Sequence, residues 1–594
     1  MTRIPLRPLA RILDARAKGA DPDRIEQENL AQRHAALREA ARGQSQGRIF
    51  VLAATFMAGF SMIALQMGQL AASEPAEPRT ANLGANISAS RADIVDRHGN
   101  ILATNMQTHA LYVQTRDLVD PANVAQKLAA LFPDLDAGTL LRRMTDGRKF
   151  LWVRKTLSPE QMQAVHEIGD PGLLFGAREM RLYPNGQLAA HVLGGASFGA
   201  EGVHSAEVIG TAGLEKAMDA RLRDPALAGT PLALSLDLTV QTTVEEVLQT
   251  GISVLSAKGG AAILMEVATG EIVAMAAGPT FDPNDRPANP TSGLPEDSPL
   301  FNRAVQGIYE LGSTFKIFTA AQAMDLGLVN PDTMVDANAP MIWGKYKIQE
   351  FEKKNYGPLL SVSDVIAKSS NVGTAHIALM IGGVRQQAFL KSLGLMDASP
   401  LELVEAPNAK PLRPKNWSDI VTITASYGHG VSGSPMNLAA AYATLANGGR
   451  LVKPTLLHQA APYQGPQVLS EAAAKASLTM LRRVVTEGTA SMGDVAGYEV
   501  GGKTGTADKV RKGGGYYDDK VVNTFASVFP ISDPKYVLVV TLDEPVETSG
   551  AKPKRTAGWT AVPVAAEIVR RTAPLLGLRP MGRQGSATDP ARWW

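Results

Sequence analysis

Near its start the chain carries a long run of apolar positions that no charged residue interrupts. The run extends from Ile49 to Ser73, and as a helix it spans about 37 Å at about 1.5 Å per residue. This length exceeds the roughly 30 Å of a hydrocarbon core. A cleaved export signal fits less well, because its apolar part is typically about 7 to 15 residues behind a short basic segment, whereas 48 residues precede this run. We therefore predict a membrane anchor helix over residues 49–72.

The segment before the anchor is charged. Helical spacing with mixed charges over residues 22–42 predicts a solvated arm. Residues 1–48 hold ten Lys and Arg against six Asp and Glu, a net charge of +4, whereas residues 49–594 hold 49 against 51. Because basic flanks stay on the cytoplasmic side of a membrane, we expect a cytoplasmic arm, residues 1–48, and the bulk of the chain outside.

The pattern after the anchor predicts a first domain over residues 73–228. It begins with a Pro-, Ala- and Ser-rich linker at residues 73–90. The letters D-R-H-G-N between two apolar stretches then predict a hairpin that turns near Gly99-Asn100. Helical runs follow, PANVAQKLAALFPDL and SPEQMQAVHEIG, so this domain is expected to be α+β.

A second and larger domain is predicted over residues 229–572. Its start reads as a strand passing into a helix, followed by two strands around the turn Thr269-Gly270. Near its end, two more strands are joined through Asp533-Pro534. Strands at both ends with helices between predict an α+β fold with a sheet built from sequence-distant strands. The tail, residues 573–594, is rich in Gly, Arg and Pro and is expected to be disordered.

The amino-acid composition argues against several classes of function. The net charge of +2 over 594 residues gives no indication of nucleic-acid binding. The absence of cysteine excludes disulfides, thiolate metal ligands and a cysteine nucleophile. The nine histidines show no paired-ligand spacing, and His166-Glu167 only begins a zinc motif, so no metal site is predicted.

The stretch GYEVGGKTGTA, residues 497–507, fits two incompatible motifs. Gly497, Gly502, Lys503 and Thr504 satisfy the phosphate-binding pattern G-x-x-x-x-G-K-[ST]. A phosphate-binding loop, however, follows an apolar strand and begins a helix, whereas this stretch lies in Gly-rich and charged surroundings. The stretch is also expected outside the membrane, where ATP is not available. The shorter motif K-T-G on a strand over residues 500–506 is the better interpretation, and no nucleotide is expected.

Two serine patterns could mark a nucleophile. G-x-S-x-G at residues 195–199 lacks the strand and apolar helix of a nucleophile elbow, so a glycine-rich loop is predicted there. S-x-x-K occurs three times, but only Ser313 begins an apolar helix. On a helix, residues three apart share a face, so Lys316 can stand beside the Ser313 hydroxyl.

Two further motifs support Ser313. Ser369-Ser370-Asn371 is the only S-x-N in the chain and Lys503-Thr504-Gly505 the only K-T-G. The order S-x-x-K, S-x-N, K-T-G resembles that of penicillin-binding proteins and class A β-lactamases. In such a site a serine needs an adjacent base, and lowering a lysine pKa from about 10.4 to near 7 requires roughly 4–5 kcal/mol.

The resemblance implies a role for each matched residue. Lys316 would be the base, Ser369 the proton relay to the leaving amine, and Asn371 the group that orients lysine and substrate amide. The K-T-G strand, which includes Gly505, would pair with an extended substrate peptide. Lys503 with Thr504 or Thr506 would attract the substrate carboxylate. The N–H groups of Ser313 and Thr506 would form the oxyanion hole.

From Arg91 to about Arg571 the chain resembles class B penicillin-binding proteins, the membrane-anchored peptidoglycan transpeptidases. The segments RADIVDRHGNILATN, RLYPNGQLAAHVLGG, NRAVQGIYELGSTFKIFT and YGHGVSGSPMNLAAAYATLANGG carry the likeness. Asn371 matches the division-specific (septal) members, because elongation-specific members usually have aspartate there. Leu311 departs from the family's proline before Gly-Ser.

The resemblance implies a penicillin-binding transpeptidase fold, an antiparallel sheet flanked by helices, after an elongated α+β pedestal. It also implies D,D-transpeptidation through an acyl-enzyme on Ser313, inhibition by β-lactams and no cofactor. The expected place is the bacterial inner membrane, with the catalytic domain in the periplasm. Expected partners are D-Ala-D-Ala stem peptides, a lipid-II-polymerising (FtsW-like) glycosyltransferase and other division proteins.

Three alternatives stay open from the sequence. The enzyme could serve elongation instead of septation, or water could replace the acceptor amine, as in D,D-carboxypeptidases and β-lactamases. A third possibility is a catalytically silent β-lactam-binding scaffold.

Overall fold

The computed structural model divides the chain into two units, residues 1–84 and residues 85–594. The predicted linker at 73–90 and the tail from 582 onward lie outside the residues that the structure describes. The described residues are 7–72, 91–201, 206–459, 461, 463–511 and 514–581.

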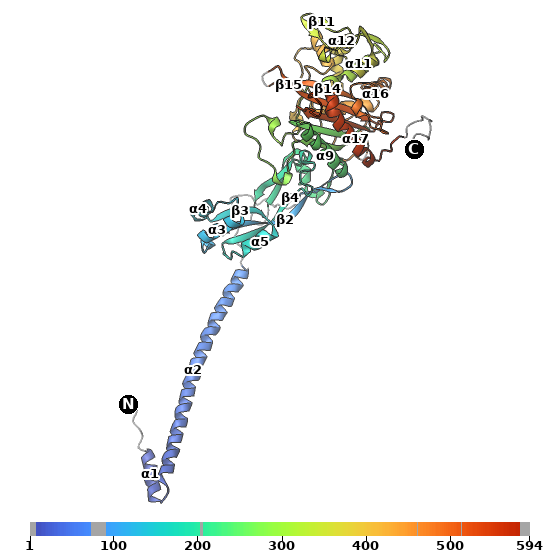
Figure 1. Cartoon of the computed structure of the whole chain (residues 1–594). Coiled ribbons are helices and arrows are strands. Elements are labelled where there is room, and N and C mark those ends of the chain that lie inside the picture. Colours follow the sequence, from blue (N-terminus) through green and yellow to red (C-terminus); the bar gives the residue numbers. More distant parts are fainter. Residues whose placement is uncertain are drawn as a thin grey trace, which may run out of the picture. The chain divides into compact units, whose positions relative to one another are not determined.

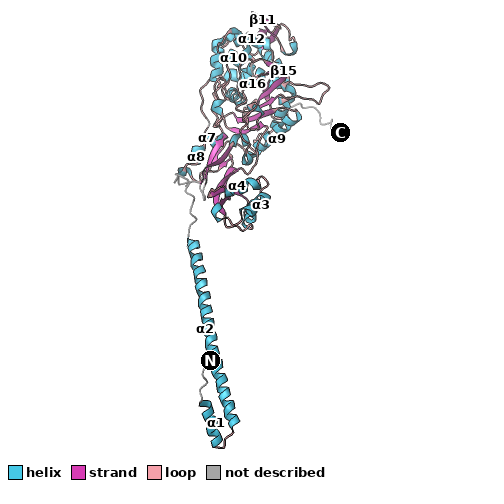
Figure 2. Ribbon diagram, turned by 90° about the vertical axis from the view of Figure 1, so that its left-hand side faces the viewer, coloured by secondary structure: helices cyan, strands magenta, loops and turns pink. Residues whose placement is uncertain are grey.

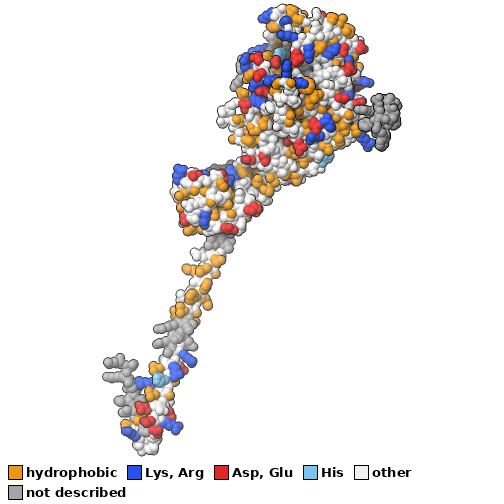
Figure 3. Space-filling model, in the orientation of Figure 1, with side chains coloured by type: hydrophobic (Ala, Val, Ile, Leu, Met, Phe, Trp, Pro, Cys, Tyr) orange, Lys and Arg blue, Asp and Glu red, His pale blue; other side chains and the backbone are white. Residues whose placement is uncertain are grey.

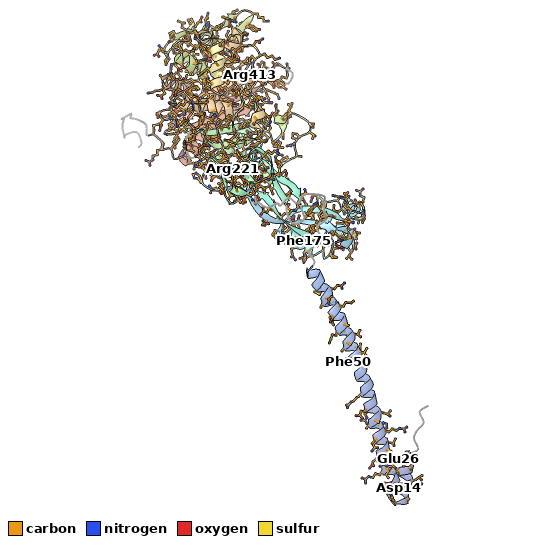
Figure 4. All side chains as sticks on the ribbon, turned by 180° about the vertical axis from the view of Figure 1, so that it is seen from behind. Asp14, Glu26, Phe50, Phe175, Arg221 and Arg413 are labelled. Carbon is orange, nitrogen blue, oxygen red and sulfur yellow. The ribbon has the colours of Figure 1, made fainter. Side chains whose placement is uncertain are left out.

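The first unit consists of helices α1 (Arg7–Ala17) and α2 (Pro22–Ala72) (Figure 1). The predicted arm and anchor therefore form one continuous helix, since no proline interrupts the sequence between them. Within the described chain, one stretch, Phe50–Met67, is long and apolar enough to cross a membrane, with mean hydropathy 1.8. Its side chains carry no charge (Figure 3), and Phe50, labelled in Figure 4, is 75% exposed.

The second unit begins with the sheet of the predicted pedestal. Strand β2 (Ile101–Gln114) pairs antiparallel with β1 (Ile94–Val95), β3 (Phe150–Leu157) and β4 (Leu173–Leu182). The predicted hairpin at Gly99 is confirmed: the Asp96 carboxylate accepts hydrogen bonds from the N–H groups of His98 and Asn100.

Three helices pack on this sheet around a small apolar core that includes Leu111, Val124 and Leu128. They are α3 (Pro121–Leu131), α4 (Ala137–Thr145) and α5 (Pro159–His166). A side chain caps each helix at its N-terminus, and the three capping residues are Asp120, Asp136 and Ser158. Such caps satisfy backbone N–H groups that have no partner within the helix.

The predicted glycine-rich loop at 195–199 is wrong, because these residues belong to β5 (Gly195–Glu201), which pairs with β6 (Ala206–Ala212). Beside this hairpin lies a buried ion network. The Glu215 carboxylate accepts hydrogen bonds from Arg91 and Arg181. The three side chains are at most 2% exposed, so each charge depends on its partners.

The five-stranded sheet of the second domain has the strand order β14-β15-β16-β8-β9, and every neighbouring pair is antiparallel. Its strands are β8 (Gly259–Glu266), β9 (Ile272–Gly278), β14 (Gly501–Val510), β15 (Tyr516–Phe529) and β16 (Tyr536–Asp543). Helices α9 (Leu238–Val254), α15 (Pro435–Ala446) and α17 (Ala561–Leu575) pack against the sheet. Figure 2 shows α9 beside the strands. This arrangement confirms the predicted α+β fold, with strands from both ends of the domain side by side.

The segment between β9 and β14 carries two of the three predicted motifs, S-x-x-K and S-x-N. The 3-10 turn η5 (Gly312–Phe315) leads into α10 (Lys316–Asp325), and α11 (Val362–Lys368) is followed by α12 (Asn371–Ile381). Other strands and α-helices of this part are β10 (Met334–Asp336), β11 (Met341–Trp343), β12 (Tyr346–Ile348), β13 (Leu359–Ser361), α13 (Gly383–Ser392), α14 (Asp419–Ser426) and α16 (Glu471–Thr486).

Short elements complete the second unit. They are β7 (Leu232–Ala233), α6 (Ala190–Leu193), α7 (Gly213–Ala217), α8 (Asp219–Leu222), and the 3-10 turns η1 (Thr115–Asp117), η2 (Pro225–Leu227), η3 (Pro283–Asp285), η4 (Pro295–Asp297), η6 (Phe351–Lys353), η7 (Ala406–Asn408), η8 (Ser491–Gly493) and η9 (Ala557–Trp559). Residues 573–581 do not fit the predicted disordered tail: α17 continues to Leu575, and the Met581 N–H donates to the Gly497 carbonyl.

Candidate active site

Ser313 lies in the tight turn η5, one turn before the buried Lys316. Gly312 enters this turn with a φ of +58°, a conformation that favours glycine. Behind the turn, the Tyr442 hydroxyl donates to the Thr314 carbonyl at 2.9 Å. The Ser313 side chain is partly exposed, and its hydroxyl has no hydrogen-bond partner within the described part of the chain. It is therefore available to a substrate.

Lys316 connects the Ser313 turn to the S-x-N motif. Its Nζ donates to the Ser369 carbonyl at 2.5 Å, to Ser369 Oγ at 3.1 Å and to Asn371 Oδ1 at 2.7 Å. No hydrogen bond joins Lys316 to Ser313 in the described residues, although both lie at the start of the same helix. Catalytic hydrogen bonds often tighten only with substrate bound.

Ser369 lies between two lysines. Lys503 Nζ donates to Ser369 Oγ at 2.9 Å, so the hydroxyl contacts both Lys316 and Lys503. Ser369 also has a φ of +63°, which is unusual for a residue other than glycine. Backbone strain of this kind persists where surrounding contacts fix it, and here those contacts hold the hydroxyl between two lysine amino groups.

The two lysines are fully buried, and burial changes their protonation. Desolvation lowers the pKa of Lys316 to about 7, although the Glu350 carboxylate partly opposes the shift. Desolvation also lowers the pKa of Lys503 well below its usual value, with Lys316 adding repulsion. A lysine of pKa near 7 exchanges protons readily at neutral pH, as a base for serine requires.

The K-T-G residues lie on β14, the edge strand of the sheet, which therefore has an unpaired side. Gly505 packs directly on the Ser313 turn: a Cβ there would lie 2.3 Å from the Leu311 carbonyl oxygen. The Thr504 hydroxyl bonds to that of Thr489 at 2.6 Å, and Thr506 Oγ1 accepts the Ala557 N–H at 3.0 Å. The free backbone edge of β14, more than these two occupied hydroxyls, is suited to an extended peptide.

Glu350 holds the S-x-N motif and has no recognisable motif of its own. It is 3% exposed and accepts hydrogen bonds from Ser370 Oγ at 2.6 Å and from the N–H of Asn371 at 2.7 Å. The neighbouring Gln349 carbonyl accepts the Asn371 side-chain amide at 2.8 Å. A carboxylate at the start of α12 is favourable for the helix dipole, but no sequence pattern connects it with a helix about 20 residues away.

The competing motifs do not form sites. Lys503 and Thr504 lie within β14 and not at the start of a helix, which a phosphate-binding loop requires. Ser197 lies within the β5–β6 hairpin. Within the described residues, no group of three or more His, Cys, Asp and Glu side chains could hold a metal ion.

Comparisons with known proteins agree with this geometry. Residues 260–569 match the penicillin binding protein transpeptidase domain, and residues 86–225 match the penicillin-binding protein dimerisation domain. A probable peptidoglycan D,D-transpeptidase FtsI from Caulobacter vibrioides is 33% identical over 559 residues, covering 91% of both chains. The peptidoglycan D,D-transpeptidase FtsI of Escherichia coli is 28% identical and covers 77% of this chain and 80% of its own.

Solved structures give the same result. Penicillin binding protein 3 from Mycobacterium tuberculosis in complex with aztreonam has a TM-score of 0.63 at 25% identity. The match covers 83% of this chain and 97% of that protein. The ampicillin complex of the same protein also gives 0.63.

Proposed function

We propose that Ser313 is the acylated nucleophile of this chain, which belongs to the class B penicillin-binding proteins, the FtsI-type peptidoglycan D,D-transpeptidases. The observation that carries the proposal is that Lys316, one helical turn after Ser313, and Lys503 both donate a hydrogen bond to the Ser369 hydroxyl. This arrangement supplies a base, a proton relay and positive charge around one accessible serine.

Acylation is proposed to begin when neutral Lys316 accepts the Ser313 proton. Ser313 Oγ then forms a bond to the carbonyl carbon of the penultimate D-Ala of a stem peptide. The tetrahedral oxyanion accepts hydrogen bonds from the N–H groups of Ser313 and Thr506, an interaction worth about 3–4 kcal/mol per donor. The C–N bond breaks, and the proton passes through Ser369 to the leaving D-Ala amine.

Deacylation completes the crosslink. The amine of a neighbouring stem peptide attacks the acyl carbon and loses a proton through the same relay, and Ser313 leaves as the hydroxyl. The free edge of β14 supports binding of the extended donor peptide. The positive charge that Lys503 shares with Lys316 attracts the terminal carboxylate of the donor, while Asn371 orients the lysine and the substrate amide.

The setting of the reaction is part of the proposal. The apolar stretch Phe50–Met67 supports a single-pass anchor, and the charge of residues 1–48 supports a cytoplasmic N-terminus with the catalytic domain in the periplasm. The S-S-N sequence at residues 369–371 supports a septal role. A lipid-II-polymerising glycosyltransferase of the FtsW type and other division proteins are the proposed membrane partners.

Mass spectrometry after labelling with a fluorescent penicillin tests the site. We expect one covalent adduct on Ser313 and none in Ser313→Ala, with the variant equally folded and inserted in the membrane. An adduct on another residue contradicts the assignment. Rapid hydrolysis of penicillin by the purified protein would instead indicate a β-lactamase-like enzyme, and septation supported by Ser313→Ala would indicate a scaffold.

A further inference from the structure

Three distant segments meet immediately before the proposed nucleophile. Tyr516 OH, at the start of β15, donates to Glu310 Oε1 at 3.0 Å. His429 Nδ1 lies 3.0 Å from Glu310 Oε2, and His429 Nε2 lies 3.1 Å from Tyr516 OH. The two rings also stack, with centroids 5.0 Å apart. We call Glu310, His429 and Tyr516 the clasp.

The clasp lies against the backbone of the Ser313 turn. Gly430 N–H donates to Glu310 Oε1 at 2.9 Å. A Cβ on Gly428 would lie 2.2 Å from the Gly312 carbonyl oxygen, and a Cβ on Gly312 would lie 3.2 Å from the Thr506 carbonyl oxygen. The loop that bears His429, the turn that bears Ser313 and edge strand β14 are therefore in direct backbone contact.

The contacts of His429 favour one protonation state. The single Tyr516 hydroxyl proton is donated to Glu310, so the Tyr516 oxygen accepts from His429 Nε2. Nδ1 lies 3.0 Å from Glu310 Oε2 in an ion-pair contact, and Oε2 accepts no hydrogen bond from the described residues, so it is the negative charge of the carboxylate that favours a proton on Nδ1. Only an imidazolium carries a proton on both ring nitrogens. The hydrogen bonds of Tyr516 and the ion pair are favourable together only when His429 is charged.

The surrounding charges agree with this state. Glu310 is 7% exposed, and its contact with the imidazole is the main cause that raises the pKa of His429, with burial opposing and Asp508 assisting. Tyr516 and Tyr427 are the other titratable groups beside the ring. Because the pKa is raised, the clasp is complete at low pH and loses its charge-assisted contacts as pH rises through that value.

We propose that Glu310, His429 and Tyr516 are positioning residues that hold the Ser313 turn at a fixed position against edge strand β14. Protonation of His429 completes the contacts among the three side chains. The proposal rests on Ser313 as the nucleophile. None of the three residues needs to touch the reacting atoms. Their effect is to fix the distance between the nucleophile and the strand that supplies Thr506.

The test is the second-order rate of penicillin acylation as a function of pH. We expect wild type to react about tenfold faster than His429→Gln at pH 6, since small misplacements of catalytic groups cost up to about 100-fold. The ratio should fall toward one at pH 9. The ratio of the wild-type rate to the His429→Gln rate is not affected by the titration of Lys316 and Lys503, because both proteins contain these lysines. A ratio near one at pH 6, or equal at both pH values, overturns the proposal.

Two further variants complete the test. His458→Gln is the matched control, because His458 is similarly half-exposed and pairs with the buried Glu271 at 3.1 Å in another region, and it should leave the rate unchanged. Tyr516→Phe keeps the stacked ring and should slow acylation about threefold at pH 6 with an unchanged melting temperature. This variant decides the question if His429→Gln unfolds, and an unaltered rate contradicts the clasp.

The adduct is located by mass spectrometry in every sample. If wild type carries no adduct on Ser313, the proposed nucleophile itself has failed. If the adduct is on Ser313 but the rate ratio does not change with pH, only the clasp has failed.

Discussion

At the scale of single residues, burial determines what the two site lysines can do. Each is fully buried and both reach Ser369 Oγ. Two ammonium groups so close repel each other, so the pair favours a single shared positive charge. In the proposed mechanism Lys316, with its pKa lowered to about 7, loses its proton and acts as the base. Repulsion from Lys316 adds to the lowering of the Lys503 pKa, so Lys503 holds the shared charge once Lys316 is neutral.

Replacing Lys316 tests this division of roles. We expect Lys316→Ala to slow penicillin acylation by about 10²- to 10⁴-fold, the usual contribution of a general base. In wild type the rate should rise with pH through about 7, because the neutral amine accumulates above the lowered pKa. Stopped-flow acylation from pH 5 to 9 measures both effects. A pH-independent wild-type rate would show that Lys316 is not the base.

Glu350, which accepts hydrogen bonds from the S-x-N motif, affects the pKa of Lys316. Its negative charge raises the pKa of Lys316 against the larger effect of burial. Glu350→Gln should therefore move the acid limb of the rate profile to lower pH. It should also slow acylation about tenfold, since a hydrogen bond to a charged group contributes about 1.5–3 kcal/mol.

The control for Glu350→Gln is Glu352→Gln in the same turn η6, where the side chain is 61% exposed. This control should leave both the rate and its pH dependence unchanged. If the two variants behave alike, the effect is one of general charge, and Glu350 does not position the motif.

At the scale of elements, the edge strand β14 and the Ser313 turn form one unit because a glycine lets them approach. The Gly505→Ala substitution would place a methyl group 2.3 Å from the Leu311 oxygen, so the strand or the turn must move. We expect acylation to fall about 100-fold, as for other misplaced catalytic groups. Gly550→Ala, whose nearest neighbour would be 3.9 Å away, should behave as wild type in acylation and in melting temperature.

Elements with a local pattern could be predicted from the sequence, and contacts between distant elements could not. The β8–β9 hairpin and the strands on either side of Asp533-Pro534 follow from short apolar runs bounded by turn residues. Residues 195–199 were misjudged because glycines that suggest a loop also occur in a short paired strand.

The candidate site, too, could be predicted from the sequence only where a residue belongs to a local motif. The three motifs mark Ser313, Ser369 and Lys503, because each is a compact pattern. Glu350 and the clasp have no such pattern: Tyr516 meets Glu310 across 206 positions of sequence. Only the fold, which brings β15 against the Ser313 turn, creates these contacts.

At the scale of the second unit, part of the pedestal belongs to the large apolar core of the transpeptidase domain, beside the smaller core that the pedestal has of its own. Strand β1 pairs in parallel with β7 across the predicted boundary at residue 228. Leu193 and Leu214 of the pedestal belong to the same buried cluster as Val240 of the transpeptidase domain. A partly buried ion pair, Arg97 Nη2 to Glu271 Oε2 at 2.8 Å, also joins the two.

This shared core predicts different behaviour for two truncated proteins. A protein of residues 85–594, which form a compact unit, should be acylated by penicillin at a rate within about twofold of that of the full chain, because all groups around Ser313 are retained.

A protein of residues 229–594 lacks the pedestal part of the core, including Ile94, Leu102, Leu193 and Leu214. Each large apolar side chain contributes about 1.5–3 kcal/mol when buried, so their loss approaches the whole stability of an ordinary domain, about 5–15 kcal/mol. The shorter protein should therefore unfold at a much lower temperature or aggregate, as thermal unfolding and size-exclusion chromatography would show. Equal melting temperatures for the two would mean that the pedestal is an independent domain and that β1 contributes nothing to the stability of the catalytic domain.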